Sequence, residues 1–416
     1  MSIRALSIFF LSYVIIVAGE YSPRKLDRPA AGLLGGVAMV VFGVLSRHEA
    51  LNAIDFPTIA LLLGMMIVIH YATVSGLLNA MADALLQRSH NARQLLWAVC
   101  MVSGILSALF INDTICLLMT PLLLTAIRRV RLNPEPYLLG LATSSNVGSV
   151  MTITGNPQNI LIGQSSSWSW AAYALRMVPI GIIGLAINCG IIAFLYRKSL
   201  SGARFTLDRP AEEQEAPLQE KLAVKTVVVL AGLLIAFVSG ASLEMTALVA
   251  AAVLLVWANR PSEETLNAVD WPLLLFFEGL FVIVEGVTKT QAHWLTKFMP
   301  AFTQRPGSFW QLAIFSTGSV IGSNVFSNVP FVMLLRGFIG PLPHAPLLWL
   351  VLAMSSTFAG NLTMLGSVAN LIVAQKAKKE CLLSFWAFLK VGIPSTLLTT
   401  LAGVLLLWIY HLLRWA

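Results

Sequence analysis

The chain has 416 residues, of which 57% are hydrophobic and 11% are charged. A soluble globular domain carries about 25% charged residues, so the composition excludes that class, and apolar blocks of membrane-span length exclude disordered, collagenous and disulfide-stapled chains. The net charge of +8 comes without a basic run interleaved with aromatic residues, so we expect contact with a lipid bilayer and not with nucleic acid.

Each half of the chain is predicted to hold three spans, a hairpin, a broken span and a last span. In the first half these cover about 4–19, 29–45, 56–74, 93–128, 135–164 and 170–196, and in the second half about 225–240, 243–258, 271–289, 308–340, 345–375 and 382–411. The polar tips of the two hairpins favour re-entrant loops over full crossings.

Two segments of the first half recur in the second half. Leu51–Pro57 matches Leu266–Pro272 at five of seven positions with a shift of 215, and the segment from Ser144 to Asn159 aligns without a gap on Ser355 to Asn370 with a shift of 211. Each copy has an odd number of crossings, so the copies enter the membrane from opposite sides. We therefore predict an all-α polytopic membrane protein of two inverted-topology repeats, 1–196 and 222–416, each with about five transmembrane helices, a re-entrant hairpin and a broken helix, joined by a linker at 197–221.

The distribution of Lys and Arg predicts the orientation. One face is expected to hold 18 of these residues and the other face 8. The positive-inside rule then makes the first face cytoplasmic, which places the linker in the cytoplasm and both termini on the periplasmic side.

Acidic side chains inside apolar segments mark candidate coupling sites, because charge in hydrocarbon is costly. Asp113, Glu278 and Glu285 are the three acids well inside such segments. Asp113 lies at the first hairpin tip, where it is expected to couple transport to protons or to cap the following helix arm, two roles that are compatible because a capping carboxylate can still titrate. Glu278 is either part of a proton relay or a buried acid bonded to a polar neighbour.

The broken spans carry the denser polar signal. The first contains Thr152, Gly155, Asn156 and Asn159 around a Gly-Asn-Pro break, and the second contains two glycines between Asn361 and Asn370. Such breaks free backbone groups that must be met by side chains, water or a ligand, and paired breaks in two halves are typical of a transport site. Polar packing between helices is the structural alternative.

Motifs of ATP hydrolysis, dinucleotide binding, zinc proteolysis and esterase chemistry are missing from the sequence. We therefore expect a transporter driven by an ion gradient and not an enzyme, with no cofactor and no metal site. An intramembrane enzyme is the contrary class, and the duplicated breaks argue against it because catalysis needs no inverted repeat.

The segments Leu109–Asp113, Leu118–Pro121, Thr154–Asn159, Ser327–Pro330 and Leu365–Leu371 together resemble the bacterial arsenite/antimonite permeases of the ion transporter superfamily. That superfamily also holds sodium-coupled divalent-anion symporters, whose tips carry Ser-Asn-Thr where this chain has Ile111-Asn112-Asp113 and Ser327-Asn328-Val329. The resemblance implies a multi-pass protein of the bacterial inner membrane that moves its substrate by an elevator-like motion, and it allows a soluble ATPase partner.

We expect proton-coupled efflux of arsenite or antimonite, with Asp113 and Glu278 as coupling residues. Trivalent arsenic is an uncharged trihydroxide near neutral pH, so amides and hydroxyls suit it better than a Lys/Arg pocket, and only Cys116 is near a tip for thiolate chemistry. The alternatives are sodium-coupled uptake of a dicarboxylate or sulfate-like anion, or sodium/proton antiport. The expected substrate-binding residues are Asn112, Asn146, Thr152, Gly155, Asn156, Asn159, Ser327, Asn328, Asn361, Thr363, Gly366 and Asn370.

Overall fold

Helices follow the apolar blocks along the chain, and the part described by the computed structural model, residues 2–18, 27–201, 218–303 and 306–415, contains no strand. In the first half the elements are α1 Ser2–Ala18, α2 Arg28–Val41, α3 Arg47–Ala53, α4 Phe56–Val74, α5 Leu77–Arg88, α6 Ala92–Leu109, α7 Asn112–Arg129, α8 Glu135–Ser149, the 3-10 turn η2 Ile153–Gly155, α9 Pro157–Ser165 and α10 Trp170–Leu195. In the second half they are α11 Glu220–Val238, α12 Leu243–Trp257, α13 Ser262–Asn267, α14 Trp271–Thr303, α15 Phe309–Phe326, α16 Asn328–Ile339, α17 Ala345–Ala359, the 3-10 turn η3 Met364–Gly366, α18 Val368–Ala377 and α19 Phe385–Leu412.

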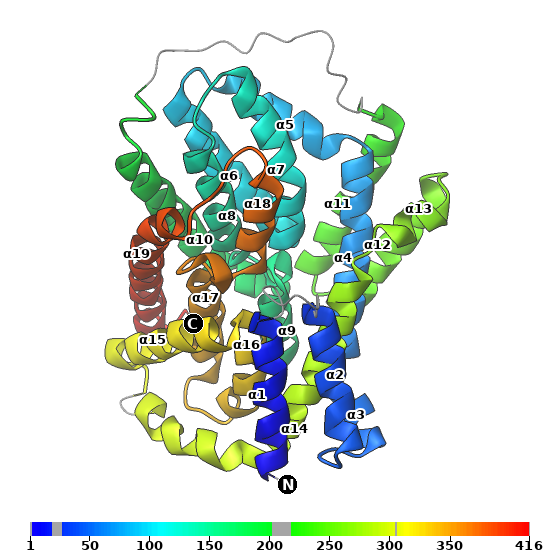
Figure 1. Cartoon of the computed structure of the whole chain (residues 1–416), viewed down its shortest axis with the longest axis vertical. Coiled ribbons are helices and arrows are strands. Elements are labelled where there is room, and N and C mark those ends of the chain that lie inside the picture. The colour runs from blue at the N-terminus through cyan, green and yellow to red at the C-terminus, as the bar shows by residue number, and fades with distance from the viewer. Residues whose placement is uncertain (1, 19–26, 202–217, 304–305, 416) are drawn as a thin grey trace.

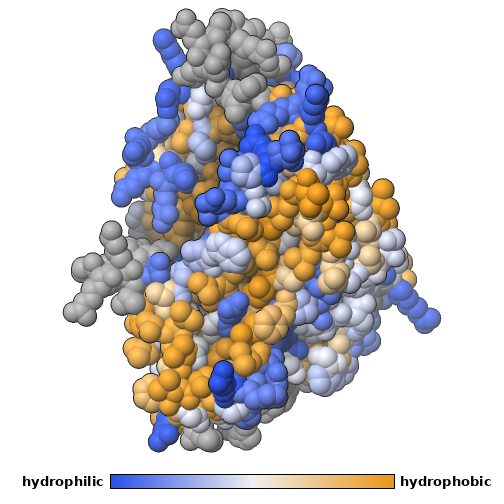
Figure 2. Space-filling view, turned by 90° about the vertical axis from the view of Figure 1, so that its right-hand side faces the viewer, coloured by the Kyte–Doolittle hydropathy of each residue, from blue (hydrophilic) through white to orange (hydrophobic). Residues whose placement is uncertain are grey.

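Six of the described helices are long and apolar enough to cross a bilayer, namely α4, α6, α10, α11, the first part of α14 and α19. On the face shown in Figure 2, hydrophobic residues cover much of the middle of the molecule and hydrophilic residues gather toward its upper end, which agrees with a membrane location. The prediction of an all-α polytopic membrane protein is confirmed.

The second half repeats the element order of the first. From α3 onward each element of the first half except α5 has a counterpart helix or turn: α3 with α13, α4 with α14, α6 with α15, α7 with α16, α8 with α17, η2 with η3, α9 with α18 and α10 with α19. The halves run in opposite directions, since α3 lies near the lower end of the molecule and α13 in its upper part (Figure 1). One difference is that α14 continues to Thr303, whereas the first half breaks between α4 and α5 at Gly76, whose φ is 79°.

The helices pack as two groups, which we call the frame and the bundle. The frame consists of α1–α4 and α11–α14. Its main contacts join a helix of one half to a helix of the other half, because α2 packs on α14 and α4 packs on α12. The bundle holds α6–α10 and α15–α19, with α8 against α6 and α17 against α15. Helix α5 contacts both groups.

Small residues bring the frame helices together. A Cβ on Gly279 of α14 would lie 2.3 Å from the carbonyl carbon of Gly32 on α2, and a Cβ on Gly64 of α4 would lie 2.6 Å from the carbonyl carbon of Ala247 on α12. Close approach at small residues is a common way for helices to associate in membranes. Any larger side chain at Gly279 or Gly64 would force these helices apart.

The short polar helices α3, α5 and α13 were not among the predicted spans. They have 7, 12 and 6 residues, too few to cross a bilayer, so a reading based on span-length hydropathy passes over them. The predicted bounds of most longer elements agree with the structure to within a few residues, as for 170–196 against Trp170–Leu195, but the span predicted at 271–289 is too short because α14 continues to Thr303.

Candidate functional site

A cavity of about 230 Å³ lies where the two hairpin tips and the two broken spans of the bundle meet frame helices α1, α2 and α14. The frame lines it with three aromatic rings, two aliphatic side chains and one guanidinium, and the bundle supplies nearly all of the remaining polar groups. Its lining consists of Tyr13, Ile16, Arg28, Asn112, Asp113, Pro157, Gln158, Leu273, Phe276, Phe277, residues 323–330 and residues 365–368.

Four polar oxygens on residues of this lining are buried and have no hydrogen-bond partner in the described part of the chain. They are Asn112 Oδ1, Ser323 Oγ, Asn324 Oδ1 and Asn328 Oδ1. The amide nitrogen of Asn112 donates to Asn146 Oδ1 at 3.0 Å, and that of Asn324 donates to the carbonyl of Ala359 at 3.0 Å, which fixes these amides with their oxygens unpaired. Buried polar groups are nearly always bonded, so this cluster of acceptors is suited to a ligand or water that donates hydrogen bonds.

Asn146 of α8 stands at the centre of a polar network that joins the two halves. Its Nδ2 donates to Asn361 Oδ1 at 2.9 Å and to Asn370 Oδ1 at 3.0 Å. Its Oδ1 accepts from Asn112 at 3.0 Å and from Ser367 Oγ at 3.0 Å. Every polar atom of this buried amide is therefore bonded, and it ties the first hairpin tip to both parts of the second broken span.

Both helix breaks are closed by the same clamp. In the first break, Asn159 Nδ2 donates to the carbonyls of Ser149 at 3.1 Å and Thr152 at 3.2 Å. In the second break, Asn370 Nδ2 donates to the carbonyls of Gly360 at 2.7 Å and Thr363 at 3.2 Å. The carbonyls of Ser149 and Gly360 lie where a break removes the helical partner, whereas those of Thr152 and Thr363 also accept from the backbone N–H groups of Gly155 at 3.4 Å and Gly366 at 3.0 Å. The amide of each asparagine therefore bonds one carbonyl of each kind.

The glycine in each break is required by close packing. A Cβ on Gly155 would lie 2.2 Å from the carbonyl oxygen of Ser149, and a Cβ on Gly366 would lie 2.9 Å from that of Gly360. The same carbonyls accept from the clamping asparagines, so a side chain at either glycine would disturb the clamp.

Asn156 and Thr357 complete the first break. Asn156 accepts from the backbone N–H of Asn159 at 2.8 Å, which caps α9, and its Nδ2 donates to Ser149 Oγ at 2.7 Å and to Thr357 Oγ1 at 3.2 Å. Thr152 Oγ1 donates to the carbonyl of Ala108 on α6. Thr357 was not among the predicted residues, although it aligns with Asn146 at the shift of 211.

The tip of the second hairpin has an unusual backbone. Ser327 has φ 65° and ψ 156°, a region that is essentially confined to glycine. The chain turns here from α15 into α16, and Ser327 is the residue between the two helices. Such a conformation costs about 1–3 kcal/mol and is held only where the surroundings determine it.

Asp113 lies in the first turn of α7 and lines the cavity. The interpretation of Asp113 as a helix cap is wrong, because the N-cap of α7 is Ile111 and this helix has no side-chain cap. The carboxylate of Asp113 instead interacts with the backbone N–H of Ala369 in α18 and lies within electrostatic reach of Arg28 and Asp270.

The structure divides the predicted site residues into two sets. Asn112, Asp113, Ser327, Asn328 and Gly366 line the cavity. The remaining substrate-binding predictions support it from behind as the breaks and the network, namely Asn146, Thr152, Gly155, Asn156, Asn159, Asn361, Thr363 and Asn370. Glu278 is partly buried on α14 and is not part of the lining.

Sequence reasoning missed the frame side of the cavity and two tip residues. Tyr13 and Arg28 come from helices far from any motif, and only the fold brings them to the hairpins. Ser323 and Asn324 stand in the polar tip and could have been found there. Cys116 is buried, lies 3.0 Å from Ser145 Oγ and is not in the lining.

Comparison with known proteins identifies the family. The family model described as citrate transporter, CitMHS, matches residues 13–357, which is most of the chain. The chain belongs to the CitMHS family. Members of this family are transporters, so the cavity of this CitMHS chain lies in a membrane transporter and not in an enzyme.

Relatives of this CitMHS chain extend over nearly its full length. The silicon efflux transporter LSI3 of Oryza sativa subsp. japonica is 32% identical, with 91% of this chain and 92% of that protein covered. A Dictyostelium discoideum protein that bears the name arsB is 25% identical over 95% of this chain and 90% of its own length. The YdaH transporter of Alcanivorax borkumensis, described as having an unusual topology, shares the fold with a TM-score of 0.56 at 14% identity, covering 99% of both chains.

Proposed function

We propose that this CitMHS chain exports the uncharged trihydroxides of arsenic or antimony across the bacterial inner membrane, coupled to protons. The observation that supports this most directly is the cluster of four unpaired acceptors in the cavity, Asn112 Oδ1, Ser323 Oγ, Asn324 Oδ1 and Asn328 Oδ1. A metalloid trihydroxide carries three O–H donors, and donors are what these oxygens lack.

The charge of the cavity supports a neutral substrate. Arg28 and Asp113 are the two formally charged residues of its lining, and their charges cancel while Asp113 is ionised. A tricarboxylate such as citrate would enter this apolar cavity with several charges, and burying them without paired cations is costly. An uncharged hydroxide meets no such cost.

Asp113 is the proposed coupling residue. In the proposed cycle Asp113 binds a proton from outside and releases it inside, and the bundle moves against the frame in an elevator-like motion that carries the substrate outward. Asp113→Asn is expected to abolish efflux driven by a pH gradient, measured with arsenite in proteoliposomes. Glu278→Gln is the matched control on α14: retained coupling in this variant assigns the proton to Asp113 alone, and lost coupling adds Glu278 as a relay.

The proposed architecture for this cycle is two inverted repeats at 1–196 and 222–416 joined by a linker at 197–221, with the linker cytoplasmic and both termini periplasmic. The repeated element order and the opposite placement of α3 and α13 support the division (Figure 1). A soluble arsenical-pump ATPase is a proposed partner, and co-purification with the tagged chain tests it.

Silicic acid is the second candidate substrate, because the rice relative at 32% identity is named a silicon efflux transporter. It is also an uncharged hydroxide that donates hydrogen bonds, so the same acceptors suit it. The third candidate is sodium-coupled uptake of citrate, a dicarboxylate or a sulfate-like anion, since the family is described as citrate transporters. A related possibility is sodium/proton antiport, in which sodium is exchanged for protons and no organic substrate is carried.

One experiment separates these candidates. Purified chain in proteoliposomes is given arsenite, silicic acid or citrate under either a pH gradient or a sodium gradient, and flux is measured in each combination. Arsenite flux under the pH gradient supports the proposal, and sodium-dependent citrate flux without arsenite flux overturns it.

A second experiment tests the binding site. Asn328→Ala removes one acceptor and should weaken arsenite binding by about fivefold or more, as expected for a lost hydrogen bond of about 1 kcal/mol. Asn156→Ala and Asn361→Ala should weaken it through the break and the network.

A further inference from the structure

Two polar contacts hold the second hairpin of the bundle against the frame. Arg336 of α16 donates from Nη1 to Asp55 Oδ2 at 3.0 Å, and Tyr13 of α1 donates from its hydroxyl to the carbonyl of Phe326 at 2.8 Å. The Arg336 side chain is 30% exposed and that of Asp55 is 15% exposed, so the ion pair is partly shielded from water. The Arg336 guanidinium also lies over the Phe281 ring of α14, 5.7 Å from its centre.

The Asp55 side chain also caps a helix, and this second contact fixes its carboxylate in place. Its Oδ1 accepts from the backbone N–H of Thr58 at 3.1 Å and caps α4, so the carboxylate that receives Arg336 is anchored on the frame. The repeated motif places Asp270 at the same position before α14, where it caps the helix by accepting from Leu273 N at 3.0 Å. At the shift of 215, however, Arg336 aligns with Pro121, which has no charge to offer Asp270. The contact is therefore built on one side of the inverted repeat.

A second cavity of about 340 Å³ lies along the same seam between α14 and α16. The substrate cavity touches α14 as far as Phe277, and the second cavity begins at Phe281, one turn or about 6 Å further along the helix. Phe277 and Phe281 are each 2% exposed, so apolar rings fill this turn of the seam. Arg336 lines the second cavity beside Phe281.

We propose that Arg336 and Tyr13 form a gate that holds the second hairpin on the frame. The closed gate separates the substrate cavity from the second cavity. When the gate opens, the second cavity becomes the path between the substrate cavity and the side of the membrane that the substrate cavity does not reach in the state described here. Opening of the gate requires the contacts of Arg336 with Asp55 and of Tyr13 with Phe326 to break. Because the contact is one-sided, it biases the resting transporter toward the state described here. The proposal rests on the chain being a transporter and not on the identity of its substrate.

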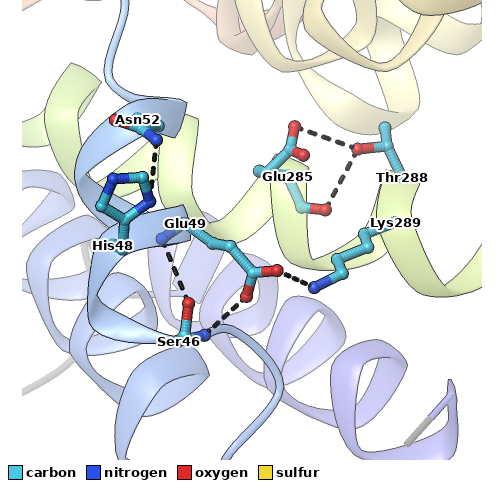
Figure 3. A network of polar contacts seen from close by, with 7 residues as sticks. All are labelled: Ser46, His48, Glu49, Asn52, Glu285, Thr288 and Lys289. Atoms are coloured by element: carbon cyan, nitrogen blue, oxygen red, sulfur yellow. Dashed lines mark hydrogen bonds and ion pairs between the residues drawn. The ribbon is translucent and has the colours of Figure 1, made fainter.

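The other charged groups beside Arg336 have partners of their own. Lys289, which also lines the second cavity, pairs with Glu49 of α3 (Figure 3). Thr288 Oγ1 lies 3.1 Å from the backbone carbonyl oxygen of Glu285 and 3.5 Å from its carboxylate, and it shares one hydroxyl proton between them. The Lys289 pair joins two frame helices, α3 and α14, and does not touch the bundle. Lys289→Gln is therefore a matched control, since it breaks an ion pair beside the same cavity without releasing the hairpin.

The test measures which side of the membrane reaches the hairpin tip. Val325 lines the substrate cavity and is 61% exposed, so Val325→Cys provides a label site, with Cys381→Ser removing the partly exposed native thiol. Sealed vesicles of both orientations are treated with a membrane-impermeant maleimide, and the ratio of the two labelling rates reports the conformational bias. The full-length chain is used without substrate.

We expect a strong bias in the parent and a reduction of about three- to tenfold in Arg336→Gln, Asp55→Asn and Tyr13→Phe, the range for loss of one partly buried polar contact. Arg336→Lys keeps the charge and should restore much of the bias, which separates the gate from a folding defect in Arg336→Gln. Lys289→Gln should keep the parent ratio. Equal labelling from both sides in the parent, an unchanged ratio in Arg336→Gln and Tyr13→Phe, or an equal loss in Lys289→Gln would each overturn the proposal.

Discussion

Replacement of Asn370 by alanine tests whether the clamp of the second break holds the structure. The substitution removes the donor to the carbonyls of Gly360 and Thr363 and the acceptor for Asn146 Nδ2. In the variant the Thr363 carbonyl still accepts a hydrogen bond from the N–H of Gly366 at 3.0 Å, and Asn146 Nδ2 still donates to Asn361. The Gly360 carbonyl is therefore the group most affected, because it loses the bond from Asn370.

The expected cost follows from these contacts. A buried group left without its partner costs about 1–3 kcal/mol, and each of the two lost bonds whose partner stays bonded costs about 0.5–1 kcal/mol. The sum is about 2–5 kcal/mol. With an unfolding entropy of roughly 2.1 cal/mol/K per residue, a 416-residue chain loses about 1 °C of Tm per kcal/mol, so the Tm should fall by about 2–5 °C.

The assay is thermal unfolding of purified chain in detergent, run beside arsenite binding. Asn159→Ala, which opens the equivalent clamp of the first break, should give a similar fall. Asn52→Ala is the matched control, because Asn52 is exposed on α3 and its side chain makes one bond within the described residues, to the His48 ring (Figure 3). If Asn370→Ala unfolds at the same temperature as Asn52→Ala, the clamp does not stabilise the break and the reasoning is refuted.

Two further predictions concern the hairpin tip and the frame. Ser327→Gly should raise the Tm, because glycine adopts φ 65° without strain and the relief of about 1–3 kcal/mol exceeds the cost of the entropy that glycine adds to the unfolded chain. Ser327→Ala should not raise the Tm. A lower Tm in the glycine variant would contradict this prediction. The hydrogen bond from Lys289 lowers the pKa of Glu49 from 4.5 to about 2, so its contribution to stability is complete above pH 4.5 and is lost as the pH falls toward 2. Glu49→Gln should therefore lower the Tm at pH 7, and its difference from the parent should shrink between pH 4.5 and 2; a constant difference over that range would count against the pairing.

The breaks and the polar residues around them could be predicted from the sequence because the repeat aligns them. The shift of 211 makes Asn159 and Asn370 counterparts, and in the structure they form the same two bonds. The same alignment pairs Asn146 with Thr357, yet Thr357 was not predicted as a site residue because a threonine carries no amide to match that of Asn146.

The frame side of the cavity could not be predicted. Tyr13 bonds to Phe326 across 313 residues of sequence, and Arg28 reaches the lining of the cavity from α2. Local pattern contains no information on such contacts. Asp113 shows the same limit, since its place near a helix start favours capping, whereas the fold turns its carboxylate toward α18.

The network around Asn146 has a consequence for how the protein is made. Asn146 of the first half donates to Asn361 and Asn370 of the second, and Thr357 of the second half donates to Asn159 of the first at 3.4 Å. During synthesis the first half enters the membrane before these partners exist. Until the second half is inserted, the buried amides of the first half must bond to water or to other groups in a loosely packed intermediate. The two halves are therefore obligate partners in folding, and a chain cut in the linker should accumulate only when both fragments are produced in the same cell.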